Sequence, residues 1–172
     1  MKRHLVLIGL PGSGKSTVGK LVADQLGAPF IEPDTILVRK MQMPVARIFG
    51  MHGEASFREM ERQAMESALS GPPSVIAPGG GWAAQPGQLD EAMTKSCVIY
   101  LKVMIGTAAK RLAGDDTRPL VSSADPVGSI RGLLKDREPF YCRAEIEVKC
   151  DIKTAEQVAE EIVGLARNNA GW

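Results

Sequence analysis

A glycine-rich loop near the N-terminus constrains the fold of this chain more than any other feature. Residues 9–16 read Gly-Leu-Pro-Gly-Ser-Gly-Lys-Ser and fit the pattern G-x-x-x-x-G-K-[ST] at every position. The apolar residues 5–8 precede the loop, and apolar residues at helical spacing follow it up to Leu26. A buried strand, a glycine turn and a helix, in this order, let backbone N–H groups surround phosphate oxygens. We therefore expect a nucleoside triphosphate here, with Lys15 at its β- and γ-phosphates and Ser16 ligating Mg²⁺.

The rest of the chain alternates short apolar runs with segments of helical periodicity. The expected strands are residues 5–8, 30–31, 74–77, 97–101 and 146–149. The expected helices are residues 18–26, 35–49 (divided at Pro44), 54–69, 89–93, 105–112, 127–137 and 154–167. Such alternation predicts parallel βαβ units, hence an α/β fold with helices on both faces of one sheet. A length of 172 residues suits one domain of this kind.

The charge balance limits the class of partner. Lysine and arginine number 21 against 20 acidic residues, a formal net charge of +1. A broad nucleic-acid-binding face is therefore not expected, although a few local cations suffice for a small anionic ligand. The three cysteines are widely spaced without a C-x-x-C pair, which is typical of reduced thiols in a cytoplasmic protein. No run approaches the roughly 18 apolar residues of a membrane span, so no membrane partner is expected.

The motifs beyond the glycine loop decide which nucleotide chemistry is expected. A GTPase would carry an N-K-x-D guanine motif, and the sequence has none. The strand expected at 74–77 leads into the glycines 79–81, whereas a Walker B strand would end in an acid. The acids nearest the expected metal are Glu32 and Asp34, just past the second strand. A small-molecule kinase fits this layout better than a GTPase or a motor ATPase.

Three further features are candidates for acceptor binding or catalysis, each with a plainer alternative. Glu61 follows Arg58 by three residues on one helical face and can orient it, or the two can form a surface ion pair. The glycines 79–81 allow close backbone approach to a substrate, or form only a flexible turn. Arg118 lies in the polar segment 113–126 and can close over a nucleotide as part of a lid, or remain a solvated charge, as can Arg137.

Together these motifs resemble the shikimate kinase family over nearly the whole chain. The ordered set F-R-x-x-E, G-G-G, R-P-L and R-x-P-x-Y is far more specific than the glycine loop alone. The matching residues are 9–17, 30–34, Gly53, Glu54, Phe57, Arg58, Glu61, 79–81, Arg118, Pro119, Leu120, Asp125, Pro126, Arg137, Pro139 and Tyr141.

The resemblance implies a three-layer α/β/α P-loop kinase fold with a five-stranded parallel sheet. It also implies a single domain, residues 1–172, with a substrate-binding insert near 32–62 and a lid near 113–126. The implied reaction transfers the γ-phosphate of ATP to the 3-hydroxyl of shikimate, with Mg²⁺ as cofactor. A cytoplasmic monomer is expected, with the small molecules ATP and shikimate as its substrates.

The resemblance also assigns roles to individual residues. Asp34 would bind the shikimate hydroxyls and act as the base, and Lys15 and Arg118 would complete the catalytic set. Arg58 and Arg137 would clamp the shikimate carboxylate, and Gly80 and Gly81 would contact shikimate through backbone N–H groups. The implied ATP-binding residues are Gly12, Ser13, Gly14, Lys15, Ser16, Thr17, Arg111 (stacked on adenine) and Arg118.

The sequence departs from the family pattern at two places that bear on the metal. Glu32 stands where the family usually has aspartate, so its carboxylate, placed to reach Mg²⁺ through water, is one methylene longer. Ala77 and Pro78 replace a hydroxyl residue that often precedes the three glycines. Two alternatives to the shikimate assignment remain: a gluconate- or nucleotide-type kinase, and a non-catalytic nucleotide-binding regulator of the same fold.

Overall fold

The computed structural model describes residues 1–113, 120–122 and 124–172, and its centre is a five-stranded parallel sheet. The strands lie in the order β2-β3-β1-β4-β5, so the first strand stands in the middle. Its Val6 pairs with Ile76 on one side and Val98 on the other. The strands are β1 (His4–Ile8), β2 (Phe30–Ile31), β3 (Val75–Ile76), β4 (Ser96–Lys102) and β5 (Ile146–Lys149). The parallel sheet expected from the alternating pattern is confirmed.

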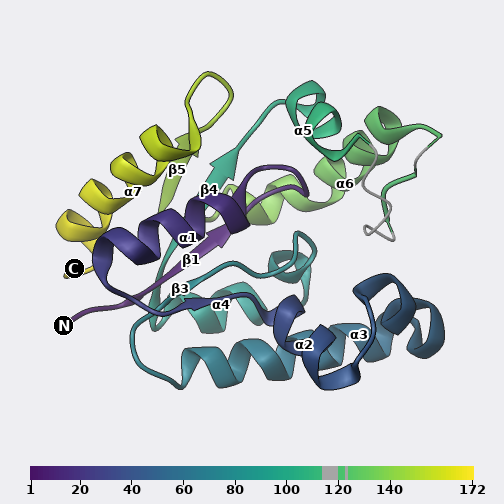
Figure 1. The fold of residues 1–172 in the computed structure, drawn as a ribbon, viewed down its shortest axis with the longest axis horizontal. Coiled ribbons are helices and arrows are strands. Elements are labelled where there is room, and N and C mark those ends of the chain that lie inside the picture. Colours follow the sequence, from purple (N-terminus) through teal and green to yellow (C-terminus); the bar gives the residue numbers. More distant parts are fainter. Residues whose placement is uncertain (114–119, 123) are drawn as a thin grey trace.

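Helices cover both faces of the sheet and give the expected three layers. Helices α1 and α7 lie side by side on one face, and α4 and α6 lie on the other (Figure 1). Helices α2 and α3 pack against each other at one end of the molecule. The helices are α1 (Lys15–Leu26), α2 (Pro33–Met41), α3 (Val45–Leu69), α4 (Gln88–Met93), α5 (Ile105–Leu112), α6 (Pro126–Tyr141) and α7 (Ala155–Asn169), with a short 3₁₀ turn η1 (Trp82–Ala84).

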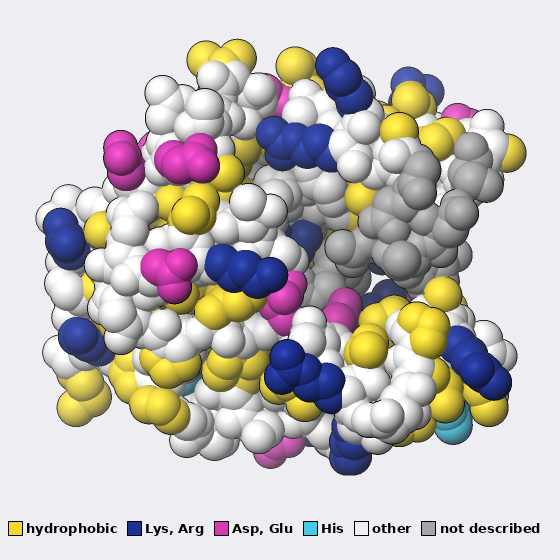
Figure 2. All heavy atoms as spheres, in the orientation of Figure 1, with side chains coloured by type: hydrophobic (Ala, Val, Ile, Leu, Met, Phe, Trp, Pro, Cys, Tyr) yellow, Lys and Arg dark blue, Asp and Glu magenta, His cyan; other side chains and the backbone are white. Residues whose placement is uncertain are grey.

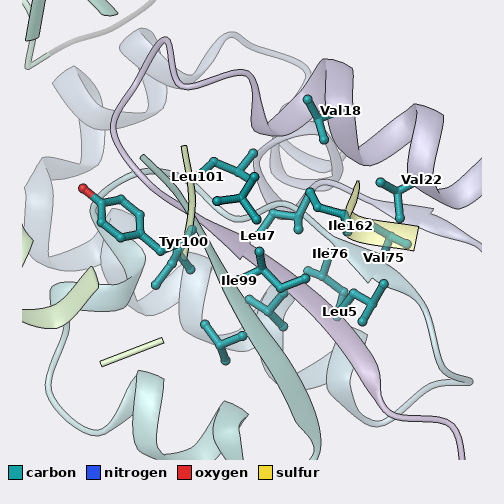
Figure 3. Close-up of a cluster of buried hydrophobic side chains, with 14 of the residues drawn as sticks. Leu5, Leu7, Val18, Val22, Val75, Ile76, Ile99, Tyr100, Leu101 and Ile162 are labelled. Carbon is teal, nitrogen blue, oxygen red and sulfur yellow. The ribbon is translucent and has the colours of Figure 1, made fainter. Parts of the chain in front are cut away.

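The main core forms where the sheet meets these helices. Every residue of β1 is buried, which explains its continuous apolar sequence, because helices cover both of its faces. Leu5 and Leu7 of this strand lie among side chains from β3, β4, α1 and α7 (Figure 3). A smaller apolar cluster around Ile48 and Phe57 joins α2 to α3. The second cluster gives the α2–α3 region its own packing beside the sheet.

Two local features differ from the sequence-based expectation, and a third agrees with it. Helix α6 continues to Tyr141, four residues beyond the expected end at Arg137, with Pro139 inside it. The turn η1 was not expected, because its short sequence carries no helical periodicity. Helix α3 contains a non-helical residue, Gly53 with φ 77°, so the segment from Glu54 onward runs as the separate helix that was expected. Among the described residues, no helix is both long and apolar enough to cross a membrane.

Candidate active site

The phosphate-binding loop joins β1 to α1, and its glycines are required by its geometry. Gly12 and Gly14 have φ of 80° and 95°, a region that residues with a Cβ rarely adopt. A Cβ on Gly12 would also lie 2.8 Å from the carbonyl oxygen of Ala108. Gly14 is the N-cap of α1, so the first helical N–H groups and the positive end of the helix dipole face the loop. This is a site built for phosphate.

Lys15, the first residue of α1, holds the two ends of the loop together. Its ammonium donates to the carbonyl oxygens of Gly9 at 2.8 Å and Leu10 at 2.9 Å. It is half-buried and lies on the wall of the adjacent cavity. The same ammonium is therefore within the loop, where phosphate oxygens would meet it.

Three oxygen-bearing side chains meet beside the loop at the expected metal position. The Ser16 hydroxyl donates to one Glu32 carboxylate oxygen, and the Thr35 hydroxyl lies 3.5 Å from the other. Hydroxyl and carboxylate oxygens are ligands that Mg²⁺ prefers, and Mg²⁺ commonly keeps several waters and substrate phosphates besides. Within the described residues no group of three or more His, Cys, Asp and Glu side chains could hold a metal. The donor set thus fits a magnesium ion carried largely by phosphate and water.

Arg111 approaches the loop from α5. Its guanidinium donates to the carbonyl oxygen of Gly12 at 3.2 Å and lies 3.7 Å from the place of a Cβ on Gly14. The planar guanidinium therefore borders the nucleotide side of the cavity, where a base can stack on it.

Two guanidinium groups converge on one glycine of the 79–81 loop. A Cβ built on Gly81 would lie 2.6 Å from one nitrogen of Arg58 and 2.9 Å from one of Arg137. Arg58 comes from α3 and Arg137 from α6, and Arg137 is buried at 8% exposure. Two forks of donors at one point suit a single planar carboxylate.

A pair of carboxylates faces the neighbouring Gly79. A Cβ there would lie 2.6 Å from Glu61 Oε1 and 3.2 Å from Asp34 Oδ2. The other oxygen of Glu61, Oε2, accepts from Arg58 at 2.9 Å, as the three-residue spacing suggested, and Glu61 is buried at 1% exposure. Burial, with the negative charge of Asp34, raises the pKa of Glu61 to about 7, although Arg58 opposes this shift. Glu61 is therefore a buried partner of the guanidinium pair rather than part of a surface ion pair.

All of these groups line one cavity of about 700 Å³. The cavity lies at the carboxyl ends of the strands, where open α/β sheets bind ligands. Figure 2 shows the surface hollowed between the sheet and the α2–α3 region, with acidic and basic side chains together in the hollow. Its lining includes Gly12, Gly14, Lys15, Ser16, Thr17, Glu32, Asp34, Arg58, Gly80, Gly81, Arg111 and Arg137 from the expected site, together with Glu61, Pro11, Phe49, Phe57 and Leu120.

One of the expected site residues that the structure describes is not on this wall. Ser13 is buried within the loop, 1% exposed. Arg118 lies outside the described residues, as do residues 114–117, 119 and 123 of the expected lid at 113–126.

Sequence reasoning missed one close contact to the 79–81 loop. Tyr141, at the end of α6, donates its hydroxyl proton to the carbonyl oxygen of Gly80 at 2.5 Å. The two residues are 61 positions apart, so no periodicity or spacing signals the contact. The only hint is that Tyr141 follows Arg137 by one helical turn and therefore shares its face.

Comparison with known proteins agrees with this geometry. A family model described as shikimate kinase matches residues 11–166. The chain belongs to the shikimate kinase family. A shikimate kinase from Moorella thermoacetica is 40% identical over 94% of this chain and 93% of its own length. One from Caldicellulosiruptor bescii is 36% identical over 95% of both chains. A solved shikimate kinase from Acinetobacter baumannii, in complex with shikimate, superposes with a TM-score of 0.93 at 30% identity, over 98% of this chain and 95% of that one.

Membership of the shikimate kinase family confirms the resemblance drawn from the ordered motifs. The family assignment covers both ends of the candidate site, since the matched range holds the phosphate loop from Pro11 onward and also Arg137. The structural superposition extends over the α2–α3 region and α6 as well, and these are the elements that carry the two guanidinium groups.

Proposed function

We propose that this enzyme transfers the γ-phosphoryl group of ATP to the 3-hydroxyl of shikimate, giving shikimate 3-phosphate and ADP. The family assignment makes the chain an ATP-dependent kinase with shikimate as acceptor. The observation that carries the proposal is the convergence of Arg58 and Arg137 on Gly81 in the same cavity as the phosphate loop. One cavity can thus hold a triphosphate and a small carboxylic acid side by side.

On the nucleotide side, the loop N–H groups and Lys15 bind and orient the phosphates. Lys15 exchanges its bonds to the Gly9 and Leu10 carbonyls for phosphate oxygens, which are charged and therefore stronger acceptors. Ser16, with Glu32 through water, would hold Mg²⁺, and the bound ion would supply positive charge to the β- and γ-phosphates. Gly12, Ser13, Gly14, Thr17 and Arg111 complete the ATP-binding set in this proposal.

On the acceptor side, the guanidinium groups of Arg58 and Arg137 grip the shikimate carboxylate. The backbone of Gly80 and Gly81 supplies N–H donors to the same substrate. Asp34, in the first turn of α2, accepts the proton of the 3-hydroxyl as its oxygen attacks the γ-phosphorus and ADP leaves. Because phosphoryl transfer demands little covalent chemistry of the protein, positioning and electrostatics supply most of the rate.

Several parts of the proposal come from the sequence. These are the role of Arg118 as a catalytic lid arginine, the lid at 113–126, the substrate-binding region at 32–62 of a single kinase domain, the monomeric state and the cytoplasmic location. Sedimentation equilibrium measures the oligomeric state directly. If Arg118 stabilises the transferred phosphoryl group, Arg118→Ala should lower kcat for shikimate phosphorylation.

An acceptor panel tests the reaction itself. ADP release is measured with ATP and shikimate, gluconate or AMP as separate acceptors, and Lys15→Ala serves as the control without phosphate binding. We expect turnover with shikimate only. Turnover with gluconate or AMP but not shikimate would reject the acceptor assignment, and ATP binding without turnover on any acceptor would favour a regulator.

The carboxylate clamp is tested by Arg58→Ala. Loss of a partly buried guanidinium that binds a carboxylate should raise the shikimate KM about 30-fold or more, with the ATP KM nearly unchanged. Arg62→Ala is the matched control, because Arg62 lies one turn further along α3 in exposed ion pairs with Glu59 and Glu66. An equal rise of both KM values in Arg58→Ala would show that Arg58 supports the fold instead.

A further inference from the structure

Tyr141 is a buried side chain whose polar end faces the acceptor side of the cavity. Its ring is fully buried in the main core and contacts the ring of Tyr100, with centroids 5.1 Å apart. Its hydroxyl donates to the carbonyl oxygen of Gly80 at 2.5 Å. Burial raises the pKa of Tyr141 to about 12, so the hydroxyl keeps its proton at neutral pH. The hydroxyl therefore donates to this carbonyl, and it also interacts with the Arg137 guanidinium, which opposes the rise in its pKa.

The accepting carbonyl belongs to the peptide unit that joins Gly80 to Gly81. In a trans peptide the C=O and the following N–H point in opposite directions, so holding one fixes the other. Both glycines line the cavity, and within the described residues neither of their N–H groups makes a hydrogen bond. With its carbonyl directed at Tyr141 in the core, the peptide directs the Gly81 N–H away from the core.

The same glycine pair lies between the two halves of the site. A Cβ on Gly80 would lie 3.0 Å from Pro11 of the phosphate loop and 3.1 Å from Arg137. Gly81 lies against Arg58 and Arg137, as described above. A rotation of this peptide would therefore move the Gly81 N–H and disturb the guanidinium pair at the same time. Glycine residues resist such a rotation less than any other residue.

We propose that Tyr141 is a positioning residue for the acceptor: by holding the Gly80 carbonyl, its hydroxyl directs the Gly81 N–H at the carboxylic acid substrate. This inference rests on the proposed function, because it needs shikimate in the clamp. Arg137 and Tyr141 lie one helical turn apart, so α6 contributes both a direct carboxylate ligand and the anchor of the backbone donor. The tyrosine ring packs in the core, and its hydroxyl holds the Gly80 carbonyl at the site.

Tyr141→Phe separates these two roles, since it keeps the ring and removes only the donor. Losing this bond should raise the shikimate KM about three- to tenfold. The ATP KM should change less than about twofold, because the phosphate loop is held by its own contacts. The sequence holds two tyrosines, so Tyr100→Phe is the matched control. It removes a hydroxyl from the ring packed against Tyr141, and we expect both KM values to stay within about twofold of wild type.

Three kinetic outcomes would overturn the inference. These are unchanged KM values in Tyr141→Phe, an equal rise for both substrates, or the same shikimate-selective loss in Tyr100→Phe. Thermal unfolding establishes that each variant is folded. If the wild type does not phosphorylate shikimate in the acceptor panel, the proposed function itself is wrong. If the wild type is active and Tyr141→Phe has the same kinetics, only the role of Tyr141 is wrong.

A second measurement does not depend on the stability of Tyr141→Phe. When the Tyr100→Phe variant is labelled with 3-fluorotyrosine, residue 141 carries the only fluorine. Shikimate should shift its ¹⁹F resonance, because the ligand on Gly81 polarises the peptide whose carbonyl accepts from Tyr141. No shift with shikimate, or the same shift with ATP alone, would contradict the proposed coupling.

Discussion

At the scale of single residues, Glu61 lies between the guanidinium of Arg58 and the carboxylate of Asp34 in the acceptor site. One of its oxygens accepts from Arg58, and the other faces Gly79 beside Asp34. Its ordinary pKa of 4.5 rises to about 7 in the fold, because burial and Asp34 outweigh the guanidinium. Between these two values the folded protein holds a proton that the unfolded chain has lost. The contribution of Glu61 to stability is therefore complete below pH 4.5 and is lost as the pH rises to about 7.

Glu61→Gln should remove this pH dependence. Glutamine resembles the protonated acid, so the thermal midpoint of the variant minus that of wild type should increase between about pH 5 and pH 8. Glu54→Gln is the control, because Glu54 also contacts Arg58, at 3.5 Å, but is largely exposed. A difference for Glu61→Gln that stays constant or falls over this range would contradict the raised pKa.

At the scale of elements, the loop between β3 and η1 connects the acceptor side of the site to the phosphate loop. Each of its three glycines faces a different set of side chains: the carboxylates at Gly79, the phosphate loop and Arg137 at Gly80, and both guanidinium groups at Gly81. None of the three has a positive φ. The glycines are therefore required here for space rather than for backbone conformation.

Gly81→Ala should disable the acceptor clamp. The added methyl group would overlap Arg58 and Arg137, and relieving such overpacking commonly costs about 1–3 kcal/mol. We expect the shikimate KM to rise about tenfold or more as the guanidinium groups move apart.

Gly132→Ala is the matched control for that experiment. A Cβ on Gly132, in the exposed part of α6, would meet nothing within 4 Å. This variant should keep its kinetics and gain up to about 1 kcal/mol in the free energy of unfolding, from better helix propensity. Unchanged shikimate kinetics in Gly81→Ala would show that the clamp tolerates the methyl group.

At the scale of the whole molecule, the candidate site and the two chain termini lie at opposite ends of the sheet (Figure 1). The site lies at the carboxyl ends of the strands, and the two chain termini lie side by side at the other end (Figure 1). Trp172 donates from Nε1 to the Arg3 carbonyl at 2.9 Å, and its ring lies 4.6 Å from the Lys2 ammonium. Arg3 in turn pairs with Glu145. These contacts join the start of β1 to the end of α7 without touching the cavity.

Trp172→Ala should therefore weaken the fold and leave the chemistry intact. Loss of the hydrogen bond and of the contact with the cation should lower the free energy of unfolding by about 1–2 kcal/mol. Urea unfolding measures this change, and kcat and both KM values measured well below the transition should match wild type. A selective change in either KM would show that the termini are coupled to the site.

Local pattern predicted most elements of this molecule closely. The strands at Phe30–Ile31 and Ile146–Lys149 have the expected bounds, because alternation of apolar runs and turns is a local property. The end of α6 was placed too early because proline usually stops a helix. Pro139 nevertheless lies inside α6, where the packing of Phe140 and Tyr141 against the core favours continuation. Tertiary contacts outweighed local propensity at that point.

The sequence by itself determined the phosphate loop, the order of strands and helices, and the residue types available for the acceptor. Those properties depend on residues that are close together in the sequence, so the sequence pattern is enough to predict them. The tertiary structure alone decided that Arg58, Arg137 and Gly81 meet at one point, and that Tyr141 holds the peptide beside them. These contacts join residues 23 or more positions apart on different elements, and only the packing of α3 and α6 beside the sheet brings them within bonding distance.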